Sequence, residues 1–565
     1  MKKWIAAAMA VVTSVGCLAA GAGCTVQENI VDDEKTINVR LYKAGFGDTF
    51  IYELKQKFES VYADEGYKLN VLTPTYGSAG TAMVQEMSRG YENTKIDLYI
   101  TGAIMPNQVG KNNEYGEDEL CEDLEELVFN QTAIGYDGVE TTEKISERLN
   151  SDLVPFLRSD DGTMYGFTWA QTTAGMVVNT KKLAAYGVTE LPRTTNEMFE
   201  IFDKIRYGVD GLIEGSDKTK TYPLTYSLTT GNGGASSYQN CAWLSWFSQY
   251  DIDAYNEFLR MQTYENGQWT DMQDGYKVYE NEDLKEVLET TYHLMDMKYA
   301  AMGSSTQSLD QAQGLIMKDN NNQNNAIFML NGDWFLNEVK ANYSKNLGNI
   351  EFMNVPVISA LGVKLFGTST KYGLSDAECD EVLSFICKLV DEGKSLTEII
   401  SSVKTEFNFD LDEADAQAVA TARGVTFARG IEHLAFITKD CTKKDICALV
   451  LRMMASDDFA ETFLAHANAS SPYAKSVQTQ SPYKFVNQAK NIAMNPHFRA
   501  INSRVEGLRF KVMKSDYKIP GMDNLPLTMY GTQYRDGFGY AEAAQTLYDY
   551  SIAEAQKSWN DYFSK

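Results

Sequence analysis

The chain has 565 residues and a formal net charge of −26, from 51 Lys and Arg against 77 Asp and Glu. That length exceeds one ordinary hydrophobic core and predicts two or three packed lobes. Hydrophobic (44%) and charged (23%) residues occur as in globular proteins, which excludes disorder, collagen or coiled coil for the whole chain. The acidic surface argues against nucleic-acid binding and against electrostatic docking on anionic lipid.

The first residues have the pattern of a secretory signal. Lys2 and Lys3 precede an apolar stretch, Trp4 to Val15, that is too short to span a membrane. Small residues then lead to Cys24, which resembles the lipidated cysteine of a bacterial lipoprotein. We expect residues 1–23 to be a signal peptide and residues 24–36 to be the lipidated Cys24 and a polar tether. Lipidation at Cys17 and plain secretion are the alternatives.

The remaining cysteines are sparse, so the chain is not a disulfide scaffold. We expect free thiols, although Cys441 and Cys447 are close enough in sequence to close a small loop. The chain has four histidines and lacks the CxxC and HxxxH spacings of zinc sites. We therefore expect no metal and no cofactor. The six cysteines after the signal are Cys121, Cys241, Cys379, Cys387, Cys441 and Cys447.

Strands and helices alternate from the start of the predicted mature chain. Alternating apolar residues predict strands, and 3.6-residue periodicity predicts helices. This alternation is typical of a mostly parallel sheet covered by helices. The expected strands are 37–42, 68–72, 96–100 and 165–179, with a hairpin at 264–279. The expected helices are 50–62, 81–89, one from Asn196, 281–297, several within the acidic segment 371–425, 445–463 and 541–562.

Several motifs occur in an order that resembles a known family. The most specific is the run from Asn325 to Trp334 (NAIFMLNGDW), which is followed by Val355-Pro356. In this order the segments resemble the extracellular solute-binding proteins of ABC importers, the group that includes maltose-binding protein. The resemblance covers most of residues 37–565. Its other motifs are Arg40–Lys43, Lys55–Glu59, Ile96–Gly102, Leu120–Leu124, Asp161–Gly166, Val177–Leu183, Leu191–Thr195, Phe427–Ile437 and Leu451–Glu461.

The resemblance implies a two-lobed α/β fold like that of the periplasmic binding proteins. Each lobe would be a sheet covered by helices, with the ligand cleft between the lobes and hinge closure around the ligand. The implied lobe one is 37–166 plus 430–474, and the implied lobe two is 167–429 plus 475–565. Segments 205–275 and 371–425 are longer than in compact members of the family, and 371–425 would be an inserted acidic helical subdomain.

The candidate ligand contacts suit a sugar. An indole ring offers a flat face to the apolar side of a sugar, and Asp, Glu, Asn and Gln pair with its hydroxyls. The resemblance implies that Trp334 stacks on a sugar, and that Lys43, Asp48, Thr101 and Gly102 contact the ligand from lobe one. The alternative for each candidate is core packing, a hinge hydrogen bond or a loop or cap role. The other candidates are Asp333, Trp169, Gln171, Trp243, Asn240, Glu432 and His433.

These features predict a lipid-anchored receptor on the outer face of the cytoplasmic membrane. It would capture a carbohydrate, an oligosaccharide by preference, and deliver it as a monomer to the permease of an ABC importer. It would have no catalytic residues and no nucleic-acid partner. A receptor of the same fold for a peptide or another non-sugar solute is the main alternative. An extracellular carbohydrate-active enzyme, which would need a pair of cleft carboxylates, and a surface adhesin are more distant ones.

Overall fold

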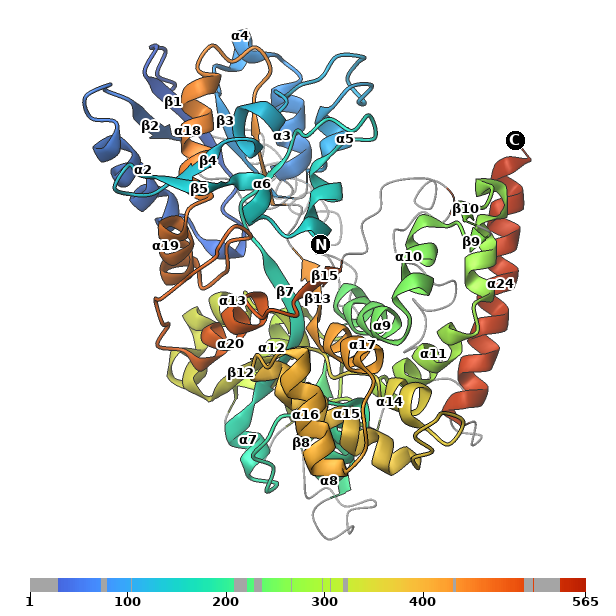
Figure 1. The fold of residues 1–565 in the computed structure, drawn as a ribbon. Coiled ribbons are helices and arrows are strands. Elements are labelled where there is room, and N and C mark those ends of the chain that lie inside the picture. The colour runs from blue at the N-terminus through green and yellow to red at the C-terminus, as the bar shows by residue number, and fades with distance from the viewer. Residues whose placement is uncertain are drawn as a thin grey trace, which may run out of the picture.

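Two helix-covered sheets organise the computed structural model of the chain (Figure 1). We call the lobe that contains β1 lobe one and the lobe that contains β11 lobe two. Cys24 and Glu432 lie outside the described residues. The described residues are 29–72, 79–102, 104–207, 221–227, 236–265, 267–296, 298–304, 306–318, 324–429, 433–501, 512 and 539–564.

The sheet of lobe one has five strands in the order β2-β1-β3-β14-β6. β1 pairs in parallel with β2 and β3, and β14 pairs antiparallel with β3 and β6. Every residue of β1 is buried, as expected of a strand covered by helices on both faces. The strands are β1 (Thr36–Leu41), β2 (Lys68–Val71), β3 (Leu98–Ile100), β6 (Phe167–Thr168) and β14 (Leu434–Ile437).

Helices and one small hairpin cover this sheet. The predicted single helix 445–463 is wrong, because the structure breaks it into α18 and α19 at Ala455 and Ser456. The elements are η1 (Ala44–Phe46), α2 (Thr49–Val61), α3 (Ala79–Met87), α4 (Tyr91–Thr94), α5 (Pro106–Val109), η2 (Glu125–Phe129), β4 (Thr132–Ile134), β5 (Glu140–Lys144), α6 (Ile145–Arg148), η3 (Ser151–Leu157), α18 (Lys444–Met454) and α19 (Asp457–Ala467).

The sheet of lobe two has the order β15-β13-β7-β11-β8, and β12 also pairs with β7. Its central strand β7 is antiparallel to β11, β12 and β13. The outer pairs β11–β8 and β13–β15 are parallel, so the sheet is mixed. The strands are β7 (Thr172–Asn179), β8 (Thr221–Thr225), β11 (Asn325–Gly332), β12 (Ile350–Met353), β13 (Val425–Arg429) and β15 (Arg499–Ile501).

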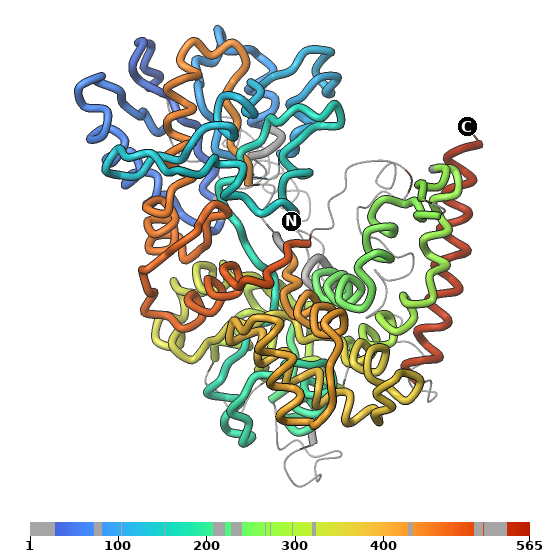
Figure 2. The backbone as a smooth tube through the Cα atoms, in the orientation of Figure 1, coloured from blue at the N-terminus to red at the C-terminus, as the bar shows by residue number. Residues whose placement is uncertain are grey.

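The helices of lobe two form a larger shell. The C-terminal helix α24 runs along its outer side, beside η4 and α11 (Figure 2). The elements are α7 (Thr180–Ala184), α8 (Thr195–Tyr207), α9 (Ser236–Tyr250), α10 (Ile252–Arg260), β9 (Tyr264–Glu265), β10 (Gln268–Trp269), η4 (Met272–Glu280), α11 (Asp283–Leu294), α12 (Leu309–Met317), α13 (Phe335–Tyr343), η5 (Ser344–Asn349), α14 (Ser359–Phe366), α15 (Asp376–Asp391), α16 (Leu396–Phe407), α17 (Glu413–Gly424), α20 (Lys484–Ala493) and α24 (Tyr540–Phe563).

The predicted helical segment 371–425 consists of α15, α16 and α17. Ser375 and Ser395 begin α15 and α16 with capping boxes, in which the Ser side chain and a Glu three residues later satisfy backbone amides at the helix start. Arg423 at the end of α17 donates two hydrogen bonds to Asp391 at the end of α15. The three helices therefore close on one another and onto lobe two. Whether the segment is an insertion stays a prediction.

Two further expectations can be compared with the structure. The predicted hairpin 264–279 is shorter than expected: it ends at Trp269, and the 3-10 helix η4 follows it. The six cysteines from Cys121 to Cys447 are buried free thiols, and the Sγ of Cys441 lies 3.2 Å from Asp97 Oδ1. Within the described residues, no helix is both long and apolar enough to cross a membrane.

Candidate functional site between the lobes

Strands that cross between the lobes end close together in lobe two. β7 begins at Thr172, directly after β6 of lobe one, and β13 ends at Arg429, opposite Thr172. The end of β11 lies beside them, because Gly332 pairs with Ala174 and the Asp333 amide donates to the Thr173 carbonyl at 3.0 Å. The sequence after β11 is therefore held at the edge of lobe two that faces lobe one.

Trp334 lies at this edge, at the start of α13. Its indole folds over Gly332, where an added Cβ would come within 2.1 Å of the ring, so only Gly fits beneath it. The side chain is half-buried and packs against the core of lobe two. Across the lobes it meets η1, since a Cβ on Gly45 would lie 4.0 Å from the Trp334 Cβ. Trp334 is thus a rigid aromatic surface between the lobes.

Lobe one places charged groups on both sides of η1. Lys43 Nζ and Asp48 Oδ2 form an ion pair at 3.1 Å, and each side chain keeps about a quarter of its surface exposed (26% and 24%). A partly exposed pair of this kind offers both a donor and an acceptor to a polar ligand. Lys43, Asp48 and Trp334 are therefore the predicted contacts that the structure brings to the same interlobe region.

Gly102 and Thr101 support this region from within lobe one. The Tyr42 ring packs directly on Gly102, where an added Cβ would lie 2.4 Å from the ring. Thr101 is fully buried: its hydroxyl donates to the Leu434 carbonyl at 2.7 Å, and its carbonyl accepts from the Trp169 indole at 2.9 Å. These contacts give both residues a structural role in joining β3 to the crossing segments.

Trp169 and His433 belong to an aromatic cluster of lobe one. Trp169 is 1% exposed and stacks on Phe50, with ring centroids 5.7 Å apart. His433 packs against Trp169 at 5.4 Å and against Phe46 of η1 at 5.2 Å. In this conformation Trp169 packs under the interlobe surface and does not form part of it. Because Phe46 belongs to η1, the cluster fixes the position of η1 opposite Trp334.

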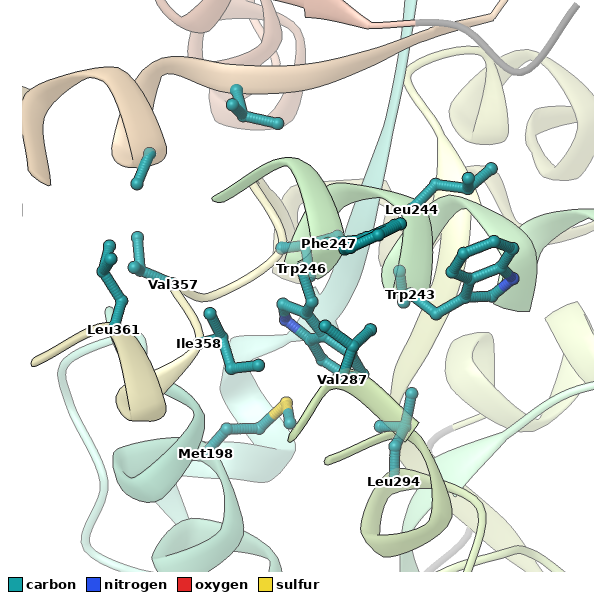
Figure 3. Packing of buried hydrophobic residues seen from close by; sticks show 14 of the residues in the cluster. Met198, Trp243, Leu244, Trp246, Phe247, Val287, Leu294, Val357, Ile358 and Leu361 are labelled. Carbon is teal, nitrogen blue, oxygen red and sulfur yellow. The ribbon is translucent and has the colours of Figure 1, made fainter. Parts of the chain in front are cut away.

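Trp243 and Asn240 lie inside lobe two. The Trp243 indole donates to Asn240 Oδ1 at 2.9 Å and packs edge-on against Phe258. Trp246 of the same helix donates to the Pro356 carbonyl at 3.0 Å, and both indoles are buried in the core that Figure 3 shows. The structure therefore does not bring Trp243 and Asn240 to the region around Trp334.

The two faces of the lobe-two sheet differ at this edge. Ala174, Met176 and Val178 of β7 pack into the same core as Trp334, whereas Val177 packs on the opposite side with Met329. Side chains alternate along a strand, so Thr172 shares the face of Trp334 and Thr173 lies on the other face. The pairing of β11 with β7 places Asn331 on the face of Thr173, and the backbone hydrogen bond from Asp333 to Thr173 continues that register by one pair. Asp333 and Trp334 thus point to opposite faces.

Sequence reasoning missed three polar residues of these strands. Thr172 Oγ1, Thr173 Oγ1 and Asn331 Nδ2 are buried, and none of them has a hydrogen-bond partner among the described residues. Buried polar groups are normally satisfied, so unpaired ones mark places where a ligand or water can bind. The sequence did carry a signal for them, because polar residues are unusual in an otherwise apolar crossing strand. Thr172 is the one that faces the Trp334 side.

Asp333 is buried in the same way. Its side chain is 1% exposed, and its Oδ1 has no partner among the described residues. Burial raises the pKa of this carboxyl to about 8, although backbone amides act in the opposite direction. At neutral pH the carboxyl is therefore largely protonated. It acts as a neutral polar group at the edge of the sheet.

Gln171 lies apart from the other candidates. Its backbone amide donates to the Ser470 carbonyl at 3.0 Å, and its side chain lines a cavity between α6 and η3 of lobe one and α20 of lobe two. Trp334, Lys43 and Asp48 do not line this cavity. Within the described residues, no group of three or more His, Cys, Asp or Glu side chains is placed to hold a metal ion.

Comparison with known proteins gives matches in structure only. No protein-family model and no curated protein matches the chain. RafE from Streptococcus pneumoniae superposes with a TM-score of 0.52 at 12% identity, covering 94% of this chain and 99% of that one. An ABC substrate-binding protein from Listeria monocytogenes, solved in complex with cycloalternan, has a TM-score of 0.50 at 12% identity and covers 94% of this chain and 100% of its own.

A chitin oligosaccharide binding protein gives a similar match, with a TM-score of 0.50 at 11% identity over 93% of this chain and 99% of that one. At such identities the matches establish the fold and nothing finer. They agree with the two mixed, helix-covered sheets joined by crossing strands that the structure shows. The chain therefore has the two-lobed α/β fold of the solute-binding proteins of ABC importers, as its sequence motifs predicted.

Proposed function

We propose that the protein is a non-enzymatic carbohydrate receptor that binds an oligosaccharide between its lobes. The observation that carries this proposal is the position of Trp334, whose half-buried indole rests on Gly332 and lies opposite η1 of the other lobe. A fixed indole suits the apolar face of a sugar ring. The Lys43–Asp48 pair supplies polar groups for its hydroxyls.

The fold supports the same proposal. One protein of this fold is described as a chitin oligosaccharide binding protein, and another was solved with cycloalternan. Ligand capture would close the lobes, and the closed form would present a new surface to a permease. We further propose that Cys24 carries the lipid anchor and that the residues between Cys24 and β1 form the tether. The protein would then stand at the outer face of the cytoplasmic membrane and deliver its ligand to an ABC permease.

A thermal-shift screen of the purified protein tests this function. The plate holds a panel of oligosaccharides, with peptides and amino acids in parallel. A ligand at 100 times its Kd should add about 2.7 kcal/mol to the free energy of unfolding, which is a shift of a few degrees. A shift confined to one oligosaccharide series is the expected result.

The same screen separates the alternatives. A shift with peptides alone would overturn the carbohydrate proposal and leave a solute receptor of the same fold. Hydrolysis of an oligosaccharide, detected by chromatography of the products, would instead indicate an enzyme. No shift with any solute would contradict a role in solute capture.

A further inference from the structure

A second candidate site lies beside the crossing strands, away from Trp334. It is a cavity of about 410 Å³, a volume within the usual range for small-molecule sites. Lobe one contributes the end of α6 and the start of η3, lobe two contributes α20 and the residues after it, and the segment 470–477 connects them. Both lobes therefore line it.

The charge of this cavity is opposite to that of the protein. Arg148, Lys475 and Lys490 line it, and none of its described lining residues is Asp or Glu. The chain as a whole has 77 acidic residues against 51 basic ones, so a wall with three cations and no carboxylate is unusual for this molecule. A cationic, partly enclosed wall of this kind raises the local concentration of anions.

Each of these cations has a partner in the protein. Arg148 pairs with Asp457 Oδ1 at 2.7 Å and with Glu143 Oε2 at 3.6 Å, so its charge is largely compensated, whereas Lys475 Nζ donates to the neutral Glu147 carbonyl at 3.1 Å. Lys490 is 5% exposed and donates to the neutral Thr479 carbonyl at 3.2 Å. Burial lowers the pKa of Lys490, partly opposed by Glu461, so its charge is not fully compensated. A bound anion would supply that compensation.

Gln171 adds an independent sign of a missing ligand. Its side chain lines the cavity and is 7% exposed, and its Nε2 has no hydrogen-bond partner among the described residues. A buried donor left unpaired costs about 1–3 kcal/mol. An acceptor oxygen on a ligand in the cavity would remove that cost. The rest of the wall includes apolar side chains, among them Leu149, Leu464 and Phe498.

We propose that this interlobe cavity binds a small organic anion, in which a carboxylate or phosphate head faces Lys490 and Gln171 and a partly apolar body fills the remainder. The proposal goes beyond carbohydrate capture and does not depend on it, because Trp334 is no part of the cavity wall. Since both lobes line the cavity, an occupant binds better at one interlobe angle than at others. It would therefore bias the opening of the lobes.

Calorimetric titration of the purified protein tests the site with three probes. 4-Phenylbutyrate carries a carboxylate, phenyl phosphate carries a phosphate, and 4-phenylbutyramide is the neutral counterpart of the first. We expect one or both anions to bind at least about tenfold more tightly than the amide, since a tenfold ratio corresponds to about 1.4 kcal/mol. Which anion binds identifies the head group.

Variants locate the binding. Lys490→Gln should weaken the better anion about tenfold or more, which is the loss expected for one charge-assisted hydrogen bond. Lys484→Gln is the matched control, because it removes the same charge from the same helix at an exposed side chain that pairs with Glu351 and does not line the cavity. It should leave the affinity within about twofold.

Lys475→Gln is a second test that does not depend on a buried substitution, since Lys475 lines the cavity and is exposed. It should also weaken binding. Trp334→Ala should leave anion binding unchanged, which separates this site from the carbohydrate proposal. Equal affinity for the anions and the amide, or no binding of any probe, would overturn the proposal. So would equal losses in the Lys484→Gln and Lys490→Gln variants.

Discussion

At the scale of the residue, Trp334 and Asp333 show how adjacent side chains of one motif take different roles. Trp334 turns its indole over Gly332 toward η1, while Asp333 is buried on the other face of the sheet. The sequence motif predicted both as ligand contacts. The turn after β11 separates them, because Trp334 lies over Gly332 while Asp333 is buried, and this difference in packing decides which of the two can meet a ligand between the lobes.

Replacing Trp334 by Ala tests the proposed stacking surface. The change should weaken the best oligosaccharide of the screen by roughly 30-fold, the ratio that corresponds to about 2 kcal/mol for a central aromatic contact. Calorimetric titration measures the loss. Trp269→Ala is the control, because Trp269 is 39% exposed in the β9–β10 hairpin, where Arg260 lies over its ring. Equal affinities of the Trp334→Ala variant and the wild type would contradict the stacking role.

The raised pKa of Asp333, about 8, predicts a pH dependence of stability. Between pH 4 and 8 the folded protein keeps a proton that the unfolded chain loses, so this group lowers the free energy of unfolding as pH rises. The slope from one such proton is at most about 1.4 kcal/mol per pH unit. Asp333→Asn should remove this contribution. The difference in free energy of unfolding between the variant and the wild type should therefore favour the variant more at pH 7.5 than at pH 5.

Urea unfolding of the wild type and of Asp333→Asn at pH 5 and pH 7.5 measures the difference. Asp64→Asn, at an exposed carboxyl, is the matched control and should follow the wild type at both pH values. A stability difference between the Asp333→Asn variant and the wild type that does not change with pH would contradict the protonated state of Asp333.

At the scale of the element, the strands and the long helices were predictable because their periodicity is strong. The expected strands near 37–42, 68–72 and 96–100 and the final helix are present within a few residues. The break between α18 and α19 was missed, since apolar residues continue in helical spacing across it. Ser456 caps the start of α19, and Asp457 and Asp458 follow in its first turn. These residues are a local signal of a helix start, but the continuous apolar pattern outweighed it in the prediction.

That cap gives a direct prediction. Ser456 Oγ accepts a hydrogen bond from the Phe459 amide at 3.1 Å, and the side chain is 2% exposed. Ser456→Ala should lower the free energy of unfolding by about 1 kcal/mol, because a helix-start amide is left without a partner. Chemical denaturation measures it. Ser401→Ala, on the exposed face of α16, should have little effect or stabilise slightly, and an equal loss in both variants would contradict the capping role.

Which Trp residues face the interlobe region could not be predicted from sequence. Trp169, Trp243 and Trp334 all lie in motifs that suit ligand contact, and only the tertiary packing distinguishes them. Trp169 stacks in the aromatic cluster of lobe one, and Trp243 packs in the core of lobe two. Aromatic side chains satisfy core packing and ligand stacking equally well, so their local sequence does not separate the two roles.

At the scale of the whole molecule, the lobes meet through more than the crossing strands. Asn337 of α13 donates to the Ala467 carbonyl at the end of α19, and Asn468 donates back to Asn337 Oδ1 at 2.8 Å. η1 and Trp334 lie nearby, and the anion cavity also has walls from both lobes. Polar contacts of this kind can break and reform at low cost, which suits lobes that change their angle.

The central claim is that the lobes close around an oligosaccharide held at Trp334. Small-angle X-ray scattering of the purified protein, with and without a saturating amount of the best oligosaccharide from the screen, tests it most directly. We predict a smaller radius of gyration in the bound state and no change with an oligosaccharide that fails to bind. An unchanged radius of gyration at saturation would contradict capture by closure of the lobes.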